Sequence, residues 1–266
     1  MSLDQSEIEQ RLKFARQIAT EAADLILSYY RTDGLSVDHK SDESPVTIAD
    51  RGAEELLRKR ILETYPNDGV LGEEFGETPA QNGLRWILDP IDGTKAFVHG
   101  VGQFGTLIGL EQGDDVILGV ANFPALKETV YASAGQGAWW IIGDEEPRPA
   151  RVSSVDTMGD ALFCFTEVTG FHKIGRADAF ESLREQCRIA RGWGDCYGHI
   201  LVATGRAEIA VDPELNPWDA APLLPIVREA GGCFADWSGN ETIHGGNGFS
   251  TNFALSETVR NILAGA

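Results

Sequence analysis

Residues 86–94 read Trp-Ile-Leu-Asp-Pro-Ile-Asp-Gly-Thr, an apolar run that leads directly into two aspartates. The apolar residues predict a buried strand, and Pro90 should stop it because proline cannot donate to a strand ladder. We therefore expect Asp89 and Asp92 at the end of a strand, where α/β folds place their ligands. The stretch predicts an α/β fold with a ligand site at this end of the strand.

The two residues that follow the second aspartate suit an anion. Gly93 lets the backbone approach a ligand closely, and a helical turn that starts at Thr94 would offer free N–H groups to a phosphate. The alternative is an ordinary Asp-Gly turn with solvated carboxylates. The apolar strand directly before the turn favours the ligand site.

Three further acidic segments accompany this one. An apolar run ends in Glu73 and Glu74, and because adjacent side chains of a strand point to opposite faces, we expect one of the two to face the site. Asp50 and Asp219 each open a predicted helix, so each could instead be part of a helix cap. Local structure alone does not readily explain all four segments, and such carboxylates are what a hard cation requires.

The composition indicates the class of protein. The chain has 266 residues, 42% of them apolar, and a formal net charge of −19. A chain of this size can bury a substantial core, and its negative charge argues against binding nucleic acid without metal mediation. No apolar run approaches the roughly 18 residues that cross a membrane, and the acidic N-terminus is not typical of a signal peptide. Scattered cysteines without such a signal indicate the cytoplasm.

Hydrophobic spacing predicts the elements of the first half. Three- and four-residue steps indicate helices over 4–31 and 48–65, and short β-rich runs follow between residues 70 and 142. The charged segment 143–154 contains two prolines and is the best linker candidate. We therefore expect an N-terminal α+β half over 1–145.

Strands and helices alternate after this linker, which is typical of an α/β unit. We predict a C-terminal α/β half over 151–266 and expect the two halves to form one compact catalytic unit. The predicted strands cover 161–168, 188–193, 207–213 and 233–237, and the predicted helices cover 177–187, 198–205, 218–232 and 256–265.

Together these segments resemble the inositol monophosphatase family. The match consists of Lys40 followed by PVTIAD at 45–50, GEE at 72–74, WILDPIDGT at 86–94 and WDAAPLLPIVREAGG at 218–232. Their order and separations agree with the family over nearly the whole chain. The resemblance implies a layered αβαβα sandwich, Mg²⁺-dependent hydrolysis of a small phosphate monoester, and a homodimer.

The resemblance also assigns metal ligands and therefore implies two or three Mg²⁺ ions. Glu73, Asp89 and the Ile91 carbonyl would hold one ion, and Asp89, Asp92 and Asp219 would hold a second. A third, weaker ion would lie near Glu73 and water. Two neighbouring cations can hold both the nucleophile and the leaving oxygen of an in-line displacement.

Further residues receive roles from the same resemblance. Thr94, paired with Asp50, would orient the attacking water, and the N–H groups of Gly93 and Thr94 would hold the phosphate. Lys40 would lie among the substrate contacts. Glu74 has no required role, and an exposed charge is its alternative.

The stretch GWGDCYG at 192–198, followed by LVATGRAEIAVDPELNPWD, resembles the branch of the family that acts on histidinol phosphate. That substrate carries an ammonium, so we expect Asp195, Asp212 or both to bind it, with turn or cap aspartates as the alternative. Trp193 could stack on the imidazole or belong to the core. His199 fits packing or an interface better than catalysis.

Other functions remain open at this point. Arg191 and Arg206 could contact phosphate, an interface or solvent. An inositol monophosphatase or a broad sugar or nucleotide phosphatase would share the metal motifs. A catalytically silent metal-binding homologue should lack a ligand or Thr94, yet all are present. A nucleotide-binding redox module is disfavoured, because no G-x-G-x-x-G follows a predicted strand.

Overall fold

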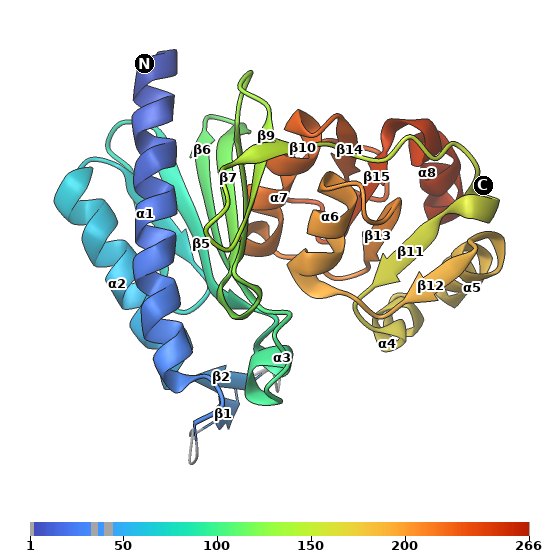
Figure 1. The fold of residues 1–266 in the computed structure, drawn as a ribbon, viewed down its shortest axis with the longest axis horizontal. Coiled ribbons are helices and arrows are strands. Elements are labelled where there is room, and N and C mark those ends of the chain that lie inside the picture. The colour runs from blue at the N-terminus through green and yellow to red at the C-terminus, as the bar shows by residue number, and fades with distance from the viewer. Residues whose placement is uncertain (1–2, 33–36, 40–44, 266) are drawn as a thin grey trace.

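The computed structural model describes residues 3–32, 37–39 and 45–265. Its elements form five layers in the order helices, sheet, helices, sheet, helices (Figure 1). The expected layered αβαβα sandwich is therefore confirmed. The helices are α1 (Gln5–Tyr29), α2 (Ile48–Thr64), α3 (Thr94–Val98), α4 (Val168–Lys173), α5 (Ala177–Gln186), α6 (Asp195–Ala203), α7 (Pro217–Glu229) and α8 (Ser256–Ala264), with short 3₁₀ turns η1 (Pro124–Leu126), η2 (Met158–Asp160) and η3 (Phe253–Leu255).

Eight strands form the larger sheet in the order β10-β9-β8-β7-β6-β5-β3-β4, and only β3 and β5 pair in parallel. Helices α1 and α2 cover one face of this sheet, and α7 covers the other (Figure 1). The strands are β3 (Gly69–Gly72), β4 (Gly76–Thr78), β5 (Leu84–Asp92), β6 (Gly105–Gln112), β7 (Asp115–Phe123), β8 (Glu128–Ser133), β9 (Ala138–Ile142) and β10 (Arg148–Ala150). A separate ribbon pairs β1 (Val37–His39) with β2 (Pro45–Thr47).

Five strands form the smaller sheet in the order β12-β11-β13-β15-β14. Strand β11 is parallel to both of its neighbours, and the other pairs are antiparallel. Helices α6 and α7 lie between the two sheets, whereas α5 and α8 pack on the outer face. The strands are β11 (Leu162–Phe165), β12 (Ile189–Arg191), β13 (Ile209–Asp212), β14 (Gly232–Ala235) and β15 (Gly248–Asn252).

Strand β5 does not stop at Pro90, contrary to the sequence prediction. It continues to Asp92 through an irregularity, since Asp89 pairs with Leu107 but Asp92 pairs with Gly105. Three residues of β5 thus advance against two of β6, and the extra residue is a bulge. In a regular strand, positions 89 and 92 would point to opposite faces, and the bulge removes that alternation. The strand therefore continues through Pro90, and the bulge changes the face toward which the following side chains point.

A pair of glycines lets α7 lie close to the larger sheet. Gly109 of β6 and Gly119 of β7 face each other across the ladder. A Cβ at Gly109 would lie 2.8 Å from the Ala221 Cβ, and one at Gly119 would lie 2.3 Å from the Pro222 carbonyl oxygen. Any side chain at either position would push the helix away. This close contact fixes the N-terminus of α7 beside the end of β5.

Most of the other elements agree with the sequence predictions, but several differ. Helix α4 was not expected, and it begins within the predicted strand 161–168. The ribbon of β1 and β2 was not expected either.

The helices predicted over 4–31 and 48–65 correspond to α1 and α2. The proposed linker 143–154 is not irregular throughout, because residues 148–150 add the edge strand β10. The strand at 248–252 was not expected, since its Gly-Phe-Ser-Thr-Asn sequence has little apolar pattern. Within the described ranges, no helix is long and apolar enough to cross a membrane.

Candidate functional site

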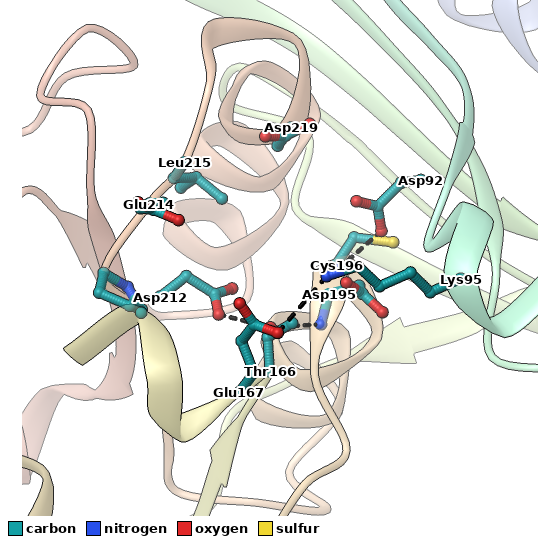
Figure 2. A pocket seen from close by; sticks show the side chains of 12 residues that line it. Asp92, Lys95, Thr166, Glu167, Asp195, Cys196, Asp212, Glu214, Leu215 and Asp219 are labelled. Atoms are coloured by element: carbon teal, nitrogen blue, oxygen red, sulfur yellow. Dashed lines mark hydrogen bonds and ion pairs between the residues drawn. The ribbon is translucent and has the colours of Figure 1, made fainter. Parts of the chain in front are cut away.

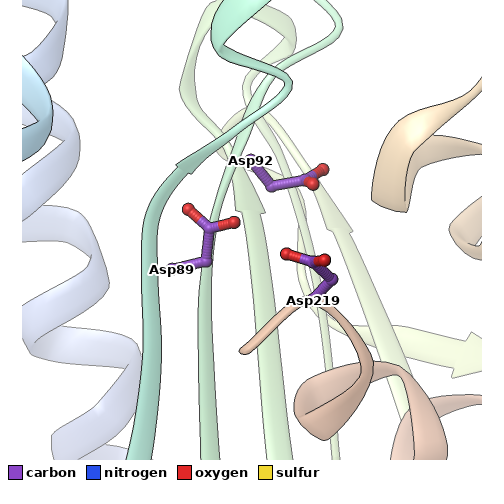
Figure 3. Close-up of side chains that lie close together, drawn as sticks. All are labelled: Asp89, Asp92 and Asp219. Carbon is purple, nitrogen blue, oxygen red and sulfur yellow. The ribbon is translucent and has the colours of Figure 1, made fainter. Parts of the chain in front are cut away.

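Three aspartates meet between the larger sheet and α7. Asp89 and Asp92 come from the bulged end of β5, and Asp219 comes from the first turn of α7. One carboxylate oxygen of each lies within 4.8 Å of those of the other two. Figure 3 shows the three side chains close together at the junction of β5 and α7. The bulge and the glycine contact under α7 together produce this arrangement.

The electrostatics of this cluster are unfavourable without a cation. Burial, followed by the charge of Glu73, raises the pKa of Asp89 well above its usual range. Burial, followed by the charge of Asp195, does the same to the pKa of Asp92. Burial raises the pKa of Asp219 to about 7, and the charge of Glu73 adds to this. The donor set consists of oxygen atoms, so it fits a hard divalent cation such as Mg²⁺.

The turn that carries Glu73 is held by a buried glutamate of α2. The Glu54 carboxylate, 0% exposed, accepts hydrogen bonds from the N–H groups of Glu74 at 2.7 Å and Phe75 at 3.2 Å. The Arg58 Nε donates to the same carboxylate at 2.7 Å. A Cβ at Gly72 would lie 2.1 Å from the Glu54 Oε1, so any side chain there would displace the Glu54 carboxylate from the turn. Glu54 therefore positions the turn from behind.

The two glutamates of this turn act on different neighbours. The charge of Glu73 raises the pKa of Asp89, whereas the charge of Glu74 contributes to the raised pKa of Asp50. Glu73 is also tied to the end of β5, because its N–H donates to the Leu88 carbonyl at 3.2 Å. Glu73 is thus the one of the pair that belongs with the three aspartates.

Asp50 caps its helix and contacts Thr94 at the same time. Its Oδ2 accepts from the Thr47 N–H at 2.8 Å, which closes the predicted capping box. Its Oδ1 lies 3.3 Å from the Thr94 Oγ1. Burial raises the pKa of Asp50 to about 6. Asp50 can therefore cap the helix and pair with Thr94 at once, because each contact uses a different oxygen of the carboxylate.

The backbone around Thr94 leaves donors available for an anion. Gly93 has a φ of 79°, in the left-handed region, and it gives α3 no side-chain cap. A Cβ at Gly93 would lie 2.9 Å from the Gln103 carbonyl oxygen, so glycine is required. The Ile91 carbonyl accepts from the Thr94 hydroxyl at 3.0 Å. The structure thus places the Ile91 carbonyl, Gly93 and Thr94 next to the acidic cluster.

A pocket opens beside the cluster toward the C-terminal half (Figure 2). Asp195 and Asp212 both line it, as do Asp92 and Asp219. Its lining is otherwise formed by Lys95, Thr166, Glu167, Gly170, Cys196, Pro213, Glu214 and Leu215. The lining thus carries six carboxylates and one lysine, which favours a ligand with positive charge next to its metal-binding end.

Asp195 and Asp212 are held differently. Burial, followed by the charge of Asp212, raises the pKa of Asp195 to about 7. Its backbone adopts a φ of 50°, which is uncommon for a residue with a side chain. Asp212 accepts from the Thr166 hydroxyl at 2.5 Å and contacts the His199 Nε2 at 3.0 Å. Hydrogen bonds thus support Asp212 on both oxygens.

The remaining candidates from the sequence lie elsewhere. Trp193 is 39% exposed, so its interpretation as a core residue is wrong, and it does not line the pocket. Arg206 pairs with Glu128 and lies 4.4 Å from the Trp140 ring, so it supports the fold away from the pocket. Arg191 is exposed and donates to the neighbouring backbone carbonyl. Lys40 lies outside the described residues.

Sequence reasoning missed the residues that support the site from behind. Glu54, Thr166 and His199 each bind a site segment through a side-chain hydrogen bond. For Glu54 a signal existed, because Asp50, Glu54 and Arg58 repeat at four-residue steps on a helix face that is otherwise apolar. Thr166 and His199 gave no such signal.

Fold and site together define a layered α/β protein with an all-oxygen metal-type site, and the comparisons name its family. A sequence model of the inositol monophosphatase family matches residues 7–264. A histidinol-phosphatase from Chlorobaculum parvum is 45% identical over 254 residues, which are 95% of each chain. A histidinol-phosphatase from Mycobacterium tuberculosis is 37% identical, over 93% of this chain and 95% of that protein.

A solved structure gives the same result. The structure of an inositol monophosphatase from Zymomonas mobilis matches with a TM-score of 0.83 and 32% identity, covering 96% of this chain and 98% of that one. The chain belongs to the inositol monophosphatase family, as its motifs predicted. Enzymes of this family depend on a divalent metal, typically Mg²⁺.

Proposed function

We propose that this protein is a Mg²⁺-dependent phosphatase that hydrolyses L-histidinol phosphate to L-histidinol and phosphate, a step of histidine biosynthesis. The observation that carries the proposal is the 45% identity to a histidinol-phosphatase over 95% of both chains. The acidic pocket beside the cluster supports it, because histidinol phosphate presents an ammonium beyond its phosphate.

In this proposal the acidic cluster is the metal site. Glu73, Asp89 and the Ile91 carbonyl would hold one Mg²⁺, and Asp89, Asp92 and Asp219 would hold a second. A third, weaker ion would lie near Glu73. When bound, Mg²⁺ supplies the positive charge that offsets the phosphate and favours ionisation of the attacking water.

The residues of the chain would place the reacting groups. The Thr94 hydroxyl lies within hydrogen-bonding distance of both the Asp50 Oδ1 and the Ile91 carbonyl, and its one proton is directed to that side. Its lone pair would then accept a hydrogen bond from a water and orient that water toward phosphorus. The N–H groups of Gly93 and Thr94 would hold the phosphate oxygens. The water oxygen would bond to phosphorus while the ester P–O bond breaks. The water gives up one proton and the leaving alcohol oxygen takes one up, so the protons balance.

Specificity would come from the other end of the substrate. Asp195 and Asp212 line the pocket next to the cluster, at a place where an ammonium could contact a carboxylate. Trp193 and Lys40 stay predictions as further substrate contacts. The homodimer and the cytoplasmic location also stay predictions.

An inositol monophosphatase is the second candidate. The observation that favours it is the 32% identity to the inositol monophosphatase from Zymomonas mobilis over nearly the whole of both chains. Carboxylates can also bind hydroxyl groups, so the acidic pocket does not by itself reject a polyol. The two candidates share the metal chemistry and differ only in the pocket.

A panel of phosphate esters tests the proposal. We expect the purified protein to release phosphate from histidinol phosphate with the highest kcat/KM among histidinol phosphate, inositol monophosphate, fructose bisphosphate and a nucleotide with a 3′-phosphate. Release should require Mg²⁺ and should stop when EDTA is added. A preference for inositol monophosphate would replace the first candidate by the second. No Mg²⁺-dependent release from any ester would reject both.

A further inference from the structure

A continuous chain of hydrogen bonds lies behind the pocket wall. It begins at Ser250 of β15, which is 0% exposed, and continues through His199 of α6, which is 1% exposed. The His199 Nδ1 lies 2.7 Å from the Ser250 Oγ, and the His199 Nε2 lies 3.0 Å from the Asp212 Oδ2. The imidazole thus has a partner on each nitrogen, and one of the two lines the pocket.

Thr166 extends this chain to the second pocket aspartate. Its hydroxyl donates to the Asp212 Oδ1 at 2.5 Å and accepts from the Asp195 N–H at 2.7 Å. Figure 2 shows Thr166 between the two aspartates. Gly194 makes the contact possible, since a Cβ there would lie 2.1 Å from the Thr166 Cα. The backbone of Asp195, with its positive φ, is therefore tied to the Asp212 carboxylate.

The proton positions in this chain follow from the chemistry of the groups. A hydroxyl has one proton, so Thr166 must give it to Asp212 because its lone pair already accepts from the Asp195 N–H. When the Asp212 carboxylate accepts on both oxygens, the neutral imidazole of His199 donates from Nε2 and its Nδ1 accepts from Ser250. All four bonds are then satisfied, and they converge on the Asp212 carboxylate from its two sides.

We propose that His199 is a positioning residue for substrate recognition. It acts through Asp212, whose carboxylate it holds against the pocket wall, and through Thr166 it supports the backbone of Asp195. The two carboxylates would thereby face the ammonium of the substrate in a fixed arrangement. This inference rests on the proposed function. In it, the selectivity of the acidic pocket for an ammonium depends on the hydrogen bonds that hold its carboxylates in place.

Packing alone does not require a histidine here. The neighbourhood of His199 on α6 is apolar, with Ile200 and Val202 at 0% exposure and the Phe234 ring at 5.9 Å between ring centroids. A buried imidazole costs free energy unless both nitrogens are hydrogen-bonded, whereas an apolar side chain would fill the space without that requirement. The hydrogen bond to Asp212 is the feature that an apolar residue could not supply.

Two amide variants separate positioning from packing. His199→Gln places an amide near the position of Nε2 and can still donate to Asp212, whereas His199→Asn reaches only the position of Nδ1 and loses that donor. The substrates are histidinol phosphate and imidazolylpropyl phosphate, which lacks only the ammonium. For His199→Asn we expect kcat/KM for histidinol phosphate to fall roughly 10-fold, mainly through KM, with less than about a 2-fold change for the analogue. His199→Gln should retain most of the wild-type preference.

Val202→Ala is the matched control, because it opens a cavity in the same helix without touching the hydrogen-bond chain. Thermal unfolding of each variant confirms that it is folded. Equal losses on both substrates in His199→Asn, or the same preferential loss in Val202→Ala, would overturn the inference. If the wild type shows no preference for histidinol phosphate over its analogue, the ammonium contact of the proposed function fails as well, and the two failures are thus distinguishable.

Discussion

Two aspartates of the acidic cluster line the same pocket as Asp212, yet the carboxylates of the cluster and of Asp212 are stabilised in opposite ways. Asp89, Asp92 and Asp219 lie close together, and burial together with the charges of neighbouring carboxylates raises their pKa values. Asp212, in contrast, receives a donor on each oxygen, from Thr166 and from His199.

The difference shows what each group is suited to bind. Buried carboxylates that repel one another need a concentrated positive charge, which a divalent cation supplies. A carboxylate that the protein already holds by hydrogen bonds has a fixed direction and suits a directional contact with an organic cation. The same residue type therefore serves metal binding in one place and recognition in the other.

The largest expected effect comes from the cluster. Asp89→Asn should lower kcat for histidinol phosphate by roughly 1000-fold or more, because Asp89 would contact both proposed ions. The fold should remain, since the substitution removes one charge from a repelling cluster. Phosphate release measures kcat, and circular dichroism shows whether the fold remains. Asp236→Asn, which changes a buried carboxylate outside the site, is the control and should stay active. Normal turnover by a folded Asp89→Asn protein would reject the metal assignment.

The next effect concerns the attacking water. Thr94→Val keeps the shape of the side chain but deletes the hydroxyl, so we expect turnover to fall roughly 100-fold, as for a positioned acid–base group. The Mg²⁺ concentration for half-maximal activity should change little. Thr94→Ser retains the hydroxyl and should recover most of the rate. A variant that loses Mg²⁺ binding while keeping its turnover at saturation would make Thr94 structural.

The recognition pair should show a substrate-dependent effect. Replacing Asp212 or Asp195 with Asn should lower kcat/KM for histidinol phosphate by roughly 10- to 100-fold, because a charged hydrogen bond to the ammonium is lost. Imidazolylpropyl phosphate never makes that bond, so its kcat/KM should fall much less. Parallel losses on both substrates would show that the aspartates support the structure of the site instead.

A smaller effect should follow from the support behind Glu73. Glu54→Gln keeps the size of the side chain but weakens its hold on the N–H groups of Glu74 and Phe75. We expect the Mg²⁺ concentration for half-maximal activity to rise roughly 10-fold, while the rate at saturating Mg²⁺ stays close to that of the wild type. An unchanged Mg²⁺ dependence would mean that Glu73 keeps its place without this contact.

The sequence predicted the structural features that depend on residues close together in the chain. The apolar strand before Asp89, the capping box at Thr47 and the helix after Asn216 are encoded within a few positions, and the family motifs add the order of the segments. These signals sufficed for the layered fold and for the position of the acidic cluster.

The sequence could not predict what depends on distant pairs. The hydrogen bond between His199 and Ser250 joins residues 51 apart, and the bond between Thr166 and Asp212 joins residues 46 apart. Such contacts follow from strand register, which no local pattern gives. Pro90 was wrongly expected to end β5, because the bulge depends on pairing with β6. Trp193 was open to a core interpretation, but it lies in the exposed turn before α6.

Thermal unfolding with and without Mg²⁺ tests most directly whether the buried carboxylates of the cluster repel one another until a cation neutralises them. The folded-state pKa values of Asp219 and Asp195, about 7, and of Asp50, about 6, exceed the ordinary value of 3.8. Between about pH 4 and pH 7 the folded chain therefore holds protons that the unfolded chain has released, so stability falls by up to about 1.4 kcal/mol per pH unit for each such proton and stops falling once the pH has passed the folded-state pKa values.

We therefore predict that the metal-free protein has a higher Tm at about pH 6 than at about pH 8, with about 2–4 °C for each kcal/mol. Mg²⁺ binds the ionised carboxylates, so it should raise Tm more at the higher pH and reduce the difference between the two. Asp89→Asn should lose most of the Mg²⁺ effect. A metal-free protein that is more stable at the higher pH, with a Tm that Mg²⁺ leaves unchanged, would contradict the account.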